Sequence, residues 1–285
     1  MIAKIFVIGP GRVGKTLARI HAQAGQEVTL CGRRPGSWQV WARKNGMATQ
    51  TGVSGANKPN KVGADKQSGL LFCVQDDALA DAISAWQGAP VSWAAHVSGL
   101  FGPAILQKIP AKNFAAIHPV FPFPISSNRI QSLQDVFVSG EVLGSAAPAK
   151  QCVKTWGAKW LNFPTSCDRA RYHAALCLAS NQVMGALGLA EQILIDGGFP
   201  AQAGKSLLQS LAKQAFHHWG ELGLKDAITG PLARGDVSTL KSQLNALKAK
   251  ERRQYLAQLR ALYLGLESSG HYSAQQKKLL KQFLQ

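Results

Sequence analysis

The chain of 285 residues is 46% apolar and 16% charged, a balance that allows a packed core and excludes global disorder. Lysine and arginine outnumber aspartate and glutamate by 32 to 15, and the net charge of +17 fits a nucleic acid, a membrane surface or an anionic small ligand. The densest basic runs, at 248–253 and 277–281, lie in helix-like segments without interleaved aromatic residues, so a nucleic-acid partner is not expected.

The spacing of the cysteines and histidines favours neither paired cysteines nor a metal site. The five cysteines are odd in number and include no C-x-x-C pair, which is typical of free thiols in a reducing compartment. The seven histidines form no ligand pattern, so we expect no metal site.

The apolar stretch at 174–190 is interrupted by polar residues at 180–182, which argues against a membrane span. We expect a cytoplasmic protein.

The first predicted elements are a strand, a glycine-rich turn, a helix and a second strand. Residues 5–8 are a continuous apolar run, as in a parallel strand that is covered on both faces. Because this run is short and leads straight into the turn, we expect a first strand and not a signal peptide. Residues 13–24 have the apolar spacing of a helix that ends at Gly25, and residues 27–31 form the next strand. Residues 2–34 are therefore expected to form a βαβ unit.

The turn of this unit has the spacing G-x-G-x-x-G, with Gly9, Gly11 and Gly14 at the glycine positions. In a dinucleotide-binding turn the first glycine permits the tight bend, the second lets the backbone approach the pyrophosphate, and the third lets the helix pack on the strand. Because the motif follows a strand and opens a helix, it predicts a Rossmann-type dinucleotide site. The expected cofactor contacts are Gly9, Pro10, Gly11, Arg12, Val13 and Gly14.

The same turn also satisfies a second phosphate-binding pattern, G-x-x-x-x-G-K-[ST], with Lys15 and Thr16 at its end. In that interpretation Lys15 binds the β- and γ-phosphates and Thr16 binds Mg²⁺. Gly11 has no role in such a loop, and no carboxylate directly follows the apolar strand at 70–74. We therefore favour the dinucleotide site.

The end of the second strand indicates which dinucleotide is bound. An acidic residue at this position accepts hydrogen bonds from the ribose 2′-OH of NAD, whereas an arginine can bind the 2′-phosphate of NADP. This chain has Arg33 and Arg34 there and no acidic residue. The sequence predicts NADP(H), with Arg33 as the first contact and Arg34 as the second. Two solvated loop arginines are the alternative.

Further strands alternate with helices after this unit. Strands are expected at 70–74, 91–96 and 114–117, with a helix at 78–86. Such alternation predicts an α/β fold with a parallel, doubly wound sheet, whose ligands bind at the carboxyl ends of the strands. Val74 and Gln75 lie at such an end and are expected to contact the cofactor. Asp76 or Asp77 is expected to cap the next helix.

Polar residues that could bind the substrate or donate a proton follow two more strands. Residues 96–99, His-Val-Ser-Gly, follow one strand, and we expect Ser98 to hydrogen-bond the substrate or the nicotinamide carboxamide. His118 follows the next strand and is a candidate proton donor. For His96 and His118, a structural role in the core is the alternative.

The pattern changes near Pro164. Helical periodicity follows at 168–195, 201–222, 239–248, 252–267 and 273–284, with no convincing strand among these segments. We therefore expect two domains, a dinucleotide-binding Rossmann domain at 1–165 and an all-helical domain at 166–285.

Two groups of polar residues in the helical part are candidates for the substrate site. His173, Cys177 and Asn181 are spaced i, i+4 and i+8, so they share one face of the predicted helix. His173 can donate a proton and Asn181 can orient a carbonyl or carboxylate. Arg234 can bind a substrate carboxylate or a cofactor phosphate, and Asp236 is expected to cap the following helix or to pair with Arg234.

Taken in order, these motifs resemble those of a known family. The glycine turn, the segments at 96–99 and 118–121, Arg-x-x-Tyr-His-Ala-Ala at 169–175 with Ala-Ser-Asn at 179–181, and Thr-Gly-Pro-x-x-Arg-Gly-Asp at 229–236 resemble the Rossmann-like NADP oxidoreductases with a helical C-terminal domain of unknown function. This family is similar to the pyrroline-5-carboxylate reductases, ketopantoate reductases and 6-phosphogluconate dehydrogenases. The resemblance implies NADP(H), a site between the domains and dimerisation through a helical domain like that of 6-phosphogluconate dehydrogenase.

The family pattern and this chain differ at one catalytic position. The ketopantoate reductases and β-hydroxyacid dehydrogenases have a lysine about one helical turn before the asparagine, whereas His173 and Cys177 precede Asn181 here. The main hypothesis is an NADP(H)-dependent reductase of a small carboxylate-bearing ketone or imine, in which His173 or His118 supplies the proton. Asn181, Ser98 and Arg234 would hold the substrate. The alternative is a non-catalytic NADP-binding redox sensor or partner-binding module.

Overall fold

The chain folds into two units, one built on a sheet and one built of helices. The computed structural model describes residues 3–52, 67–86, 90–125 and 130–285. Their internal contacts divide the chain into Met1–Ser180 and Asn181–Gln285. The sequence places the domain boundary at 165/166, where the strand pattern ends. In the contact division, the next helix, α5 (Arg169–Cys177), belongs to the first unit.

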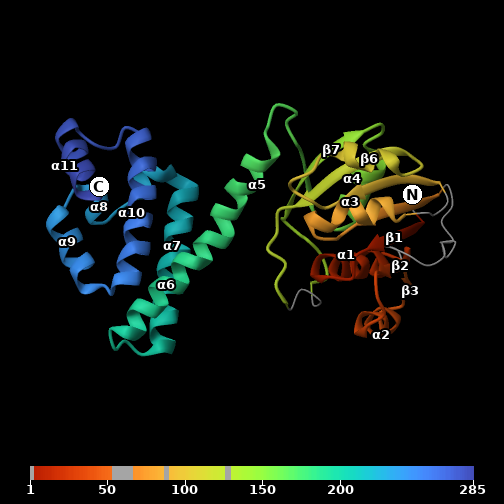
Figure 1. Ribbon diagram of the computed structural model, residues 1–285, viewed down its shortest axis with the longest axis horizontal. Coiled ribbons are helices and arrows are strands. Elements are labelled where there is room, and N and C mark those ends of the chain that lie inside the picture. The colour runs from red at the N-terminus through yellow and green to blue at the C-terminus, as the bar shows by residue number, and fades with distance from the viewer. Residues whose placement is uncertain (1–2, 53–66, 87–89, 126–129) are drawn as a thin grey trace. The chain divides into compact units, whose positions relative to one another are not determined.

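The first unit is built around a mixed sheet (Figure 1). Its strands have the order β3-β2-β1-β4-β5-β6-β7-β8. Strands β1 to β6 run parallel, β7 is antiparallel to β6, and β8 is parallel to β7. The order reverses at β1 and β4, as in a doubly wound Rossmann sheet, so the predicted fold class is confirmed. The strands are β1 (Lys4–Ile8), β2 (Glu27–Gly32), β3 (Ala48–Thr51), β4 (Ser68–Phe72), β5 (Val91–His96), β6 (Ala111–Pro119), β7 (Phe137–Leu143) and β8 (Lys159–Asn162).

Helices cover both faces of the sheet, which explains the unbroken apolar run of β1. Ile5 and Val7 are buried in one cluster with residues of α1, α2 and α4, whereas Phe6 and Ile8 are buried in a second cluster with α3 and η1. Side chains alternate across a strand, so a strand between two helical layers is apolar throughout. The helices are α1 (Arg12–Gln23), α2 (Ser37–Lys44), α3 (Asp76–Ser84), α4 (Ala147–Thr155) and the 3₁₀-helix η1 (Pro103–Lys108).

The described residues of the second unit contain helices and no strand. Its core is a buried cluster that includes Leu240, Leu266 and Leu280. Asp236 caps α9 by accepting a hydrogen bond from the Thr239 amide at 3.1 Å, as predicted. No helix of the described chain is long and apolar enough to cross a membrane. The helices are α6 (Val183–Asp196), α7 (Ala201–Ala227), α8 (Pro231–Arg234), α9 (Val237–Ala246), α10 (Ala249–Ser268) and α11 (Ala274–Leu284).

Two local predictions are wrong. Gln75 takes the N-cap position of α3, and Asp76 and Asp77 lie in the first turn, where the helix dipole favours negative charge. The predicted helix at 168–195 is also not a continuous α-helix, because Leu178–Gln182 form a π-helix, η3, between α5 and α6. A π-helical turn is wider than an α-helical turn. The α-helical spacing therefore does not continue through Asn181, and the face that it shares with His173 stays a prediction.

Candidate functional site

The turn after β1 is so tight that two of its glycines have no room for a side chain. Gly9 has a φ of +107°, and a Cβ there would lie 2.5 Å from the Cys73 carbonyl oxygen. A Cβ on Gly14 would lie 1.9 Å from the carbonyl oxygen of Gly9. The chain itself therefore requires glycine at both positions, the first for the bend and the second for the close packing of α1.

Gly11 differs because nothing in the described chain crowds it. Apart from Gly11 and its two chain neighbours, no described residue has a heavy atom within 4 Å of the position that its Cβ would take, and its φ of −74° suits any residue. Gly11 precedes α1, whose first turn contains no acidic residue. The free amide groups at this helix start therefore favour an anion. The space left by the missing side chain fits a pyrophosphate, and Pro10, Arg12 and Val13 stay predicted contacts around it.

The alternative P-loop interpretation does not fit the turn. Thr16 is fully buried, and its hydroxyl donates a hydrogen bond to the Arg12 carbonyl oxygen at 2.8 Å. The ammonium group of Lys15 lies 5.5 Å from the centroid of the Trp41 ring on α2. The hydroxyl that would bind Mg²⁺ is thus enclosed in the helix, and the sheet has the strand order of a dinucleotide-binding fold.

Arg33 and Arg34 lie directly after β2, and both are exposed. No acidic residue occurs at 28–44, a range that holds most of β2, the loop and all of α2. The indole N–H of Trp38 donates a hydrogen bond to the carbonyl oxygen of Arg34 at 3.0 Å. The loop that carries the two arginines is therefore fastened to the start of α2.

Val74 and Gln75 border the glycine turn from the next strand. Strand β4 pairs with β1 in parallel, so their carboxyl ends are neighbours. Val74 Cγ1 lies 2.9 Å from the position that a Cβ on Gly9 would take. Gln75 is exposed at the start of α3. Both residues therefore lie on the side of the sheet where the dinucleotide is expected.

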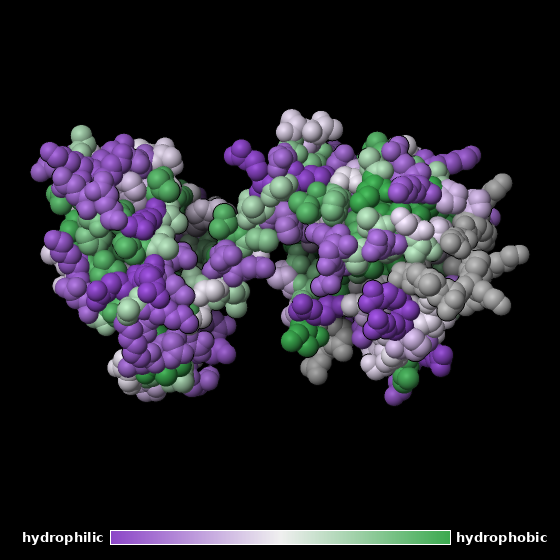
Figure 2. Space-filling view, in the orientation of Figure 1, coloured by the Kyte–Doolittle hydropathy of each residue, from purple (hydrophilic) through white to green (hydrophobic). Residues whose placement is uncertain are grey.

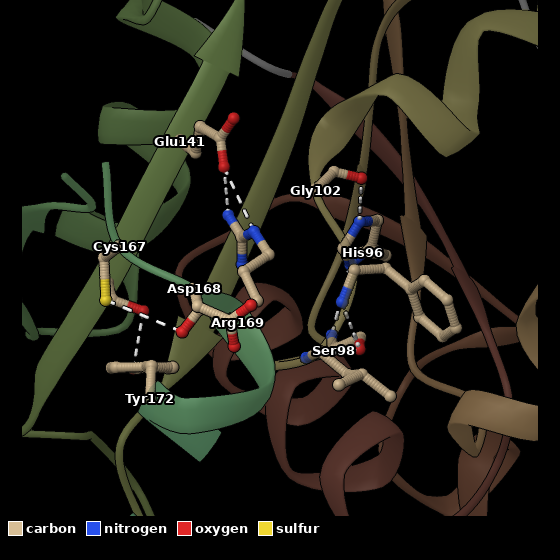
Figure 3. A network of polar contacts seen from close by, with 11 residues as sticks. His96, Ser98, Gly102, Glu141, Cys167, Asp168, Arg169 and Tyr172 are labelled. Carbon is tan, nitrogen blue, oxygen red and sulfur yellow. Dashed lines mark hydrogen bonds and ion pairs between the residues drawn. The ribbon is translucent and has the colours of Figure 1, made fainter. Parts of the chain in front are cut away.

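The turn after β5 uses Ser98 and His96 to hold its own backbone (Figure 3). The Ser98 hydroxyl oxygen accepts hydrogen bonds from the amides of Leu100 and Phe101 at 3.0 and 3.2 Å. His96 Nδ1 accepts from the Ser98 amide at 3.2 Å, so its Nε2 carries the proton and donates to the Gly102 carbonyl oxygen at 3.1 Å. Burial lowers the pKa of His96 to about 4. His96 is thus a neutral, fully hydrogen-bonded core histidine at neutral pH.

Three elements bring His118, Ser139 and Tyr172 together. His118 lies near the end of β6, Ser139 lies in β7 and Tyr172 lies on α5. The Tyr172 hydroxyl is 2.7 Å from the Ser139 hydroxyl oxygen and 3.1 Å from His118 Nδ1. The Tyr172 ring also packs edge-on against Phe163. Burial raises the pKa of Tyr172, so the hydroxyl keeps its proton at neutral pH.

His173 lies beside His118. Their ring centroids are 6.0 Å apart, with an angle of 67° between the planes. A Cβ on Gly99 would lie 2.9 Å from His173 Cδ2 and 3.1 Å from His118 Cε1, so glycine is needed where the rings approach the turn after β5. Burial, and then the proximity of His173, lower the pKa of His118 to about 4. The first unit therefore gathers both predicted histidines and the 96–99 turn at the carboxyl edge of its sheet.

An ion pair beside these histidines has no counterpart in the sequence predictions. The Arg169 guanidinium donates two hydrogen bonds to Glu141 Oε2 (Figure 3). It also lies 4.0 Å from the centroid of the Phe163 ring. Because Glu141 is in β7, the pair holds α5 against the sheet. Arg169, Tyr172 and His173 are spaced i, i+3 and i+4 on α5, so a shared helix face is the signal that could have identified them together.

The remaining predicted site residues lie in the second unit. Asn181 is part of η3, and Arg234 is an exposed residue at the end of α8. The Asp236 carboxylate is hydrogen-bonded to Thr239 and Ser238, which lower its pKa to about 2. Within the described residues no ion pair joins Arg234 to Asp236, and no three histidine, cysteine or acidic side chains are placed to hold a metal ion. The substrate-binding roles of Asn181 and Arg234 stay predictions.

Comparison with known proteins matches part of the chain to one family. Residues 137–263 match the family described as "Domain of unknown function (DUF2520)". The matched segment begins at β7 and includes most helices of the second unit. It also contains the Arg169–Glu141 ion pair, Tyr172 and the two predicted site residues Asn181 and Arg234. No curated protein matches the sequence.

Solved structures of oxidoreductases share the fold of the whole chain. A Bacteroides fragilis protein described as an NADP oxidoreductase is 18% identical, with a TM-score of 0.73 over 92% of this chain and 98% of its own. A reductive aminase from Aspergillus terreus in complex with NADPH and ethyl levulinate is 14% identical, with a TM-score of 0.65 over 99% and 100%. An imine reductase from Pseudomonas sp. is 17% identical, with a TM-score of 0.63 over 93% and 96%. These likenesses confirm the Rossmann domain followed by a helical domain that the motifs imply.

Proposed function

We propose that the chain is an NADP(H)-dependent oxidoreductase that reduces a small carboxylate-bearing ketone or imine by hydride transfer. The open space at Gly11, beside a strand end that carries Arg33 and Arg34 and no acid, is the observation that carries this proposal. The structures of similar fold add support, because they include a protein described as an NADP oxidoreductase, a reductive aminase in complex with NADPH and an imine reductase.

The glycine turn and the first two strands would hold the cofactor. The N-terminus of α1 and the space left by Gly11 would hold the pyrophosphate, and Arg33 and Arg34 would bind the 2′-phosphate. Val74 and Gln75 border the path toward the nicotinamide. When bound, the cofactor supplies the hydride that reduces the substrate carbon.

The chain itself must supply the proton that the substrate oxygen or nitrogen takes up. His118 is poorly suited to this, because its pKa of about 4 leaves it neutral at pH 7 and its Nδ1 already contacts Tyr172. His173 lies beside it on the same edge of the sheet and is only partly buried. We therefore assign proton donation to His173, and to His118 and Tyr172 the positioning of that ring.

Three further residues are proposed to orient the substrate. The Ser98 hydroxyl accepts two backbone hydrogen bonds, so its own hydrogen stays available to a substrate or to the carboxamide of the cofactor. The Asn181 amide can both donate to and accept from a carbonyl or carboxylate. The Arg234 guanidinium can bind a carboxylate through two parallel hydrogen bonds.

The helical unit is further proposed to form a homodimer. The described residues of α6 and α7 include a single buried residue, Gly204, although both helices carry large apolar side chains. Figure 2 shows hydrophobic side chains at the surface of the helical unit. Exposed apolar surface of this extent is typical of a subunit interface, and the family resemblance implies a second copy of this chain. The exposed apolar residues of the two helices include Met184, Ile195, Leu207, Leu211, Phe216, Trp219 and Leu222.

We also propose where the protein is located and what its net positive charge serves. The five cysteines are free, and three of them are buried, which favours the reducing environment of the cytoplasm. The charge of +17 suits anionic ligands such as NADPH and a carboxylate substrate, and we do not propose a nucleic-acid partner.

Oxidation of NADPH in the presence of keto acids and of cyclic imines with a carboxylate tests the reaction. We expect turnover with at least one of these substrates and weaker turnover with its ester, which lacks the negative charge. NADPH binding without turnover on any substrate would instead favour the non-catalytic cofactor-binding protein. Absence of NADPH binding would contradict both functions.

A further inference from the structure

The loop between β2 and α2 is held in one shape by contacts with the start of α2. The indole N–H of Trp38 donates to the carbonyl oxygen of Arg34 at 3.0 Å. Two residues further along, the Gly36 amide donates to the side-chain oxygen of Gln39 at 3.2 Å, and the Gln39 amide donates back to the Gly36 carbonyl oxygen at 3.1 Å. These bonds fasten the loop to the helix at two positions.

The indole of Trp38 also packs against the end of β2. A Cβ on Gly32 would lie 2.6 Å from Trp38 Cζ2 and 3.0 Å from Pro10 Cγ, so the Gly32 backbone is enclosed between the indole and the glycine turn. Trp38 is only 8% exposed and belongs to the buried cluster that includes Leu30 of β2. The indole therefore has one fixed position, between the last residue of β2 and the loop that follows.

The rigidity of this loop matters because Arg33 and Arg34 themselves are exposed. A long, flexible side chain loses conformational entropy when it binds a phosphate, and the loss is smaller if its backbone is already ordered. Side chains without their own supporting contacts depend on the backbone to bring them to a common ligand.

We propose that Trp38 is a positioning residue for the cofactor 2′-phosphate and that it contributes to the preference for NADP(H) over NAD(H). Its indole N–H holds the Arg34 backbone, and its ring supports the end of β2, so that Arg33 and Arg34 are presented together. Trp38 acts through the loop and does not contact the phosphate. This inference rests on the proposed cofactor site.

Trp38→Phe tests the inference because it keeps an aromatic ring and removes the N–H donor. We expect the dissociation constant for NADPH to rise about fivefold to tenfold, in line with the loss of one hydrogen bond and of loop order. The dissociation constant for NADH should change less than twofold, since NADH lacks the 2′-phosphate. Titration of the full-length protein with each nucleotide measures both constants.

Trp41→Phe is the matched control. It changes a second tryptophan of α2, whose ring lies under the Lys15 ammonium and whose indole, among the described residues, makes no hydrogen bond to the loop. The ratio of the two dissociation constants should stay within twofold of the wild-type ratio. Equal effects of Trp38→Phe and Trp41→Phe on this ratio would show that general disturbance of α2 is responsible, and would overturn the inference.

A double-mutant cycle tests whether Trp38 acts through the arginine loop. In a protein that already carries Arg33→Ala and Arg34→Ala, Trp38→Phe should not weaken NADPH binding further, because the side chains that it positions are gone. Adenosine 2′,5′-bisphosphate, which carries only the 2′-phosphate half of the cofactor, should show the same dependence. Full additivity of the substitutions would overturn the inference.

The outcomes separate this inference from the proposed function. If the wild type prefers NADPH and Trp38→Phe keeps the wild-type ratio, only the role of Trp38 is wrong. If the wild type binds NADPH and NADH equally, the proposed cofactor preference is wrong and the inference falls with it. Circular dichroism of each variant shows whether the fold is intact, and Gly32→Ala, which crowds the indole without changing either arginine, should reproduce the loss of preference.

Discussion

The hydroxyl group of Tyr172 joins helix α5 to the end of strand β6, because it lies 3.1 Å from Nδ1 of His118. The same hydroxyl lies 2.7 Å from the Ser139 hydroxyl oxygen, so the tyrosine is held from both sides. His173 follows Tyr172 directly on α5. The contact between Tyr172 and His118 thus sets how the two candidate histidines face each other at the edge of the sheet.

Tyr172→Phe should disturb this arrangement without unfolding the unit. It removes one hydroxyl and keeps the ring that packs on Phe163. Loss of a partly buried hydrogen bond is worth about 1 kcal/mol, so we expect kcat to fall about fivefold to tenfold while NADPH binding is unchanged. Ser139→Ala, which leaves the Tyr172–His118 contact in place, should have a smaller effect on kcat. Steady-state kinetics with both variants decide the matter, and an equal or larger loss in Ser139→Ala would contradict the positioning role.

His173→Gln tests the assignment of the proton donor. General acid catalysis contributes roughly 100-fold or more to the rate, so kcat should fall by about that factor with little change in the NADPH dissociation constant. Cys177→Ser is the control, because its sulfur lies 4.0 Å from His173 Nδ1 and the substitution leaves the imidazole intact. A larger loss in His118→Gln than in His173→Gln would reverse the assignment.

Two substitutions to alanine in the glycine turn should have opposite consequences. Gly11→Ala adds a methyl group to open space at an ordinary φ, so the melting temperature should change little while NADPH binding weakens at least tenfold. Gly14→Ala forces a Cβ to within 1.9 Å of the Gly9 carbonyl oxygen and should destabilise the fold itself. Thermal unfolding and NADPH titration separate the two effects. If Gly11→Ala binds NADPH as tightly as the wild type does, the pyrophosphate does not bind at this turn.

The first unit should lose stability in acid because of His21. Its Nε2 accepts a hydrogen bond from the indole N–H of Trp156 at 2.9 Å, and its Nδ1 bonds to the Gln26 side chain, so the buried ring is neutral. Burial lowers the pKa of His21 from 6.5 to about 4. Protonation is therefore easier in the unfolded chain. The stabilisation is fully present above pH 6.5 and is lost as the pH falls toward 4, by about 3 kcal/mol for a shift of this size.

Urea unfolding at pH 7.5 and pH 5.0 measures this loss. His21→Gln should reduce the difference in unfolding free energy between the two pH values, although His96 and His118 have pKa values lowered in the same direction and keep part of it. His217→Gln, at an exposed position of α7, should leave the difference unchanged. An identical pH dependence in wild type and His21→Gln would contradict the role of this buried histidine.

The strands and helices with strong local patterns could be predicted from the sequence. The run at 5–8, the glycine turn and the helices of the second unit follow directly from apolar spacing, glycine and capping residues. Strands β7 and β8 could not be predicted in this way. Gly140 resembles a strand breaker, but it lies in β7 because Trp160 of β8 fills the space that its Cβ would occupy, at 2.1 Å. Only the folded sheet reveals that this glycine serves close packing.

In the candidate site, too, single residues could be predicted from local patterns, whereas contacts between residues far apart in the sequence could not. His118, Ser98 and His173 were identified as single positions, from strand ends and helix spacing. Their contacts could not be, because Tyr172 reaches His118 across 54 positions of sequence and Arg169 reaches Glu141 across 28. Likewise, the π-helix that contains Asn181 has no distinct sequence pattern, so it could not be predicted from the sequence.

The preference between NADPH and NADH is the sharpest test of the proposed cofactor site. Titration of the wild-type protein with each nucleotide should give a dissociation constant for NADPH at least tenfold lower than that for NADH, because a bidentate arginine–phosphate contact is available to NADPH alone. In Arg33→Ala/Arg34→Ala the two constants should become similar through weaker binding of NADPH. Failure of the wild type to bind either nucleotide, or an unchanged ratio in the double variant, would contradict the account.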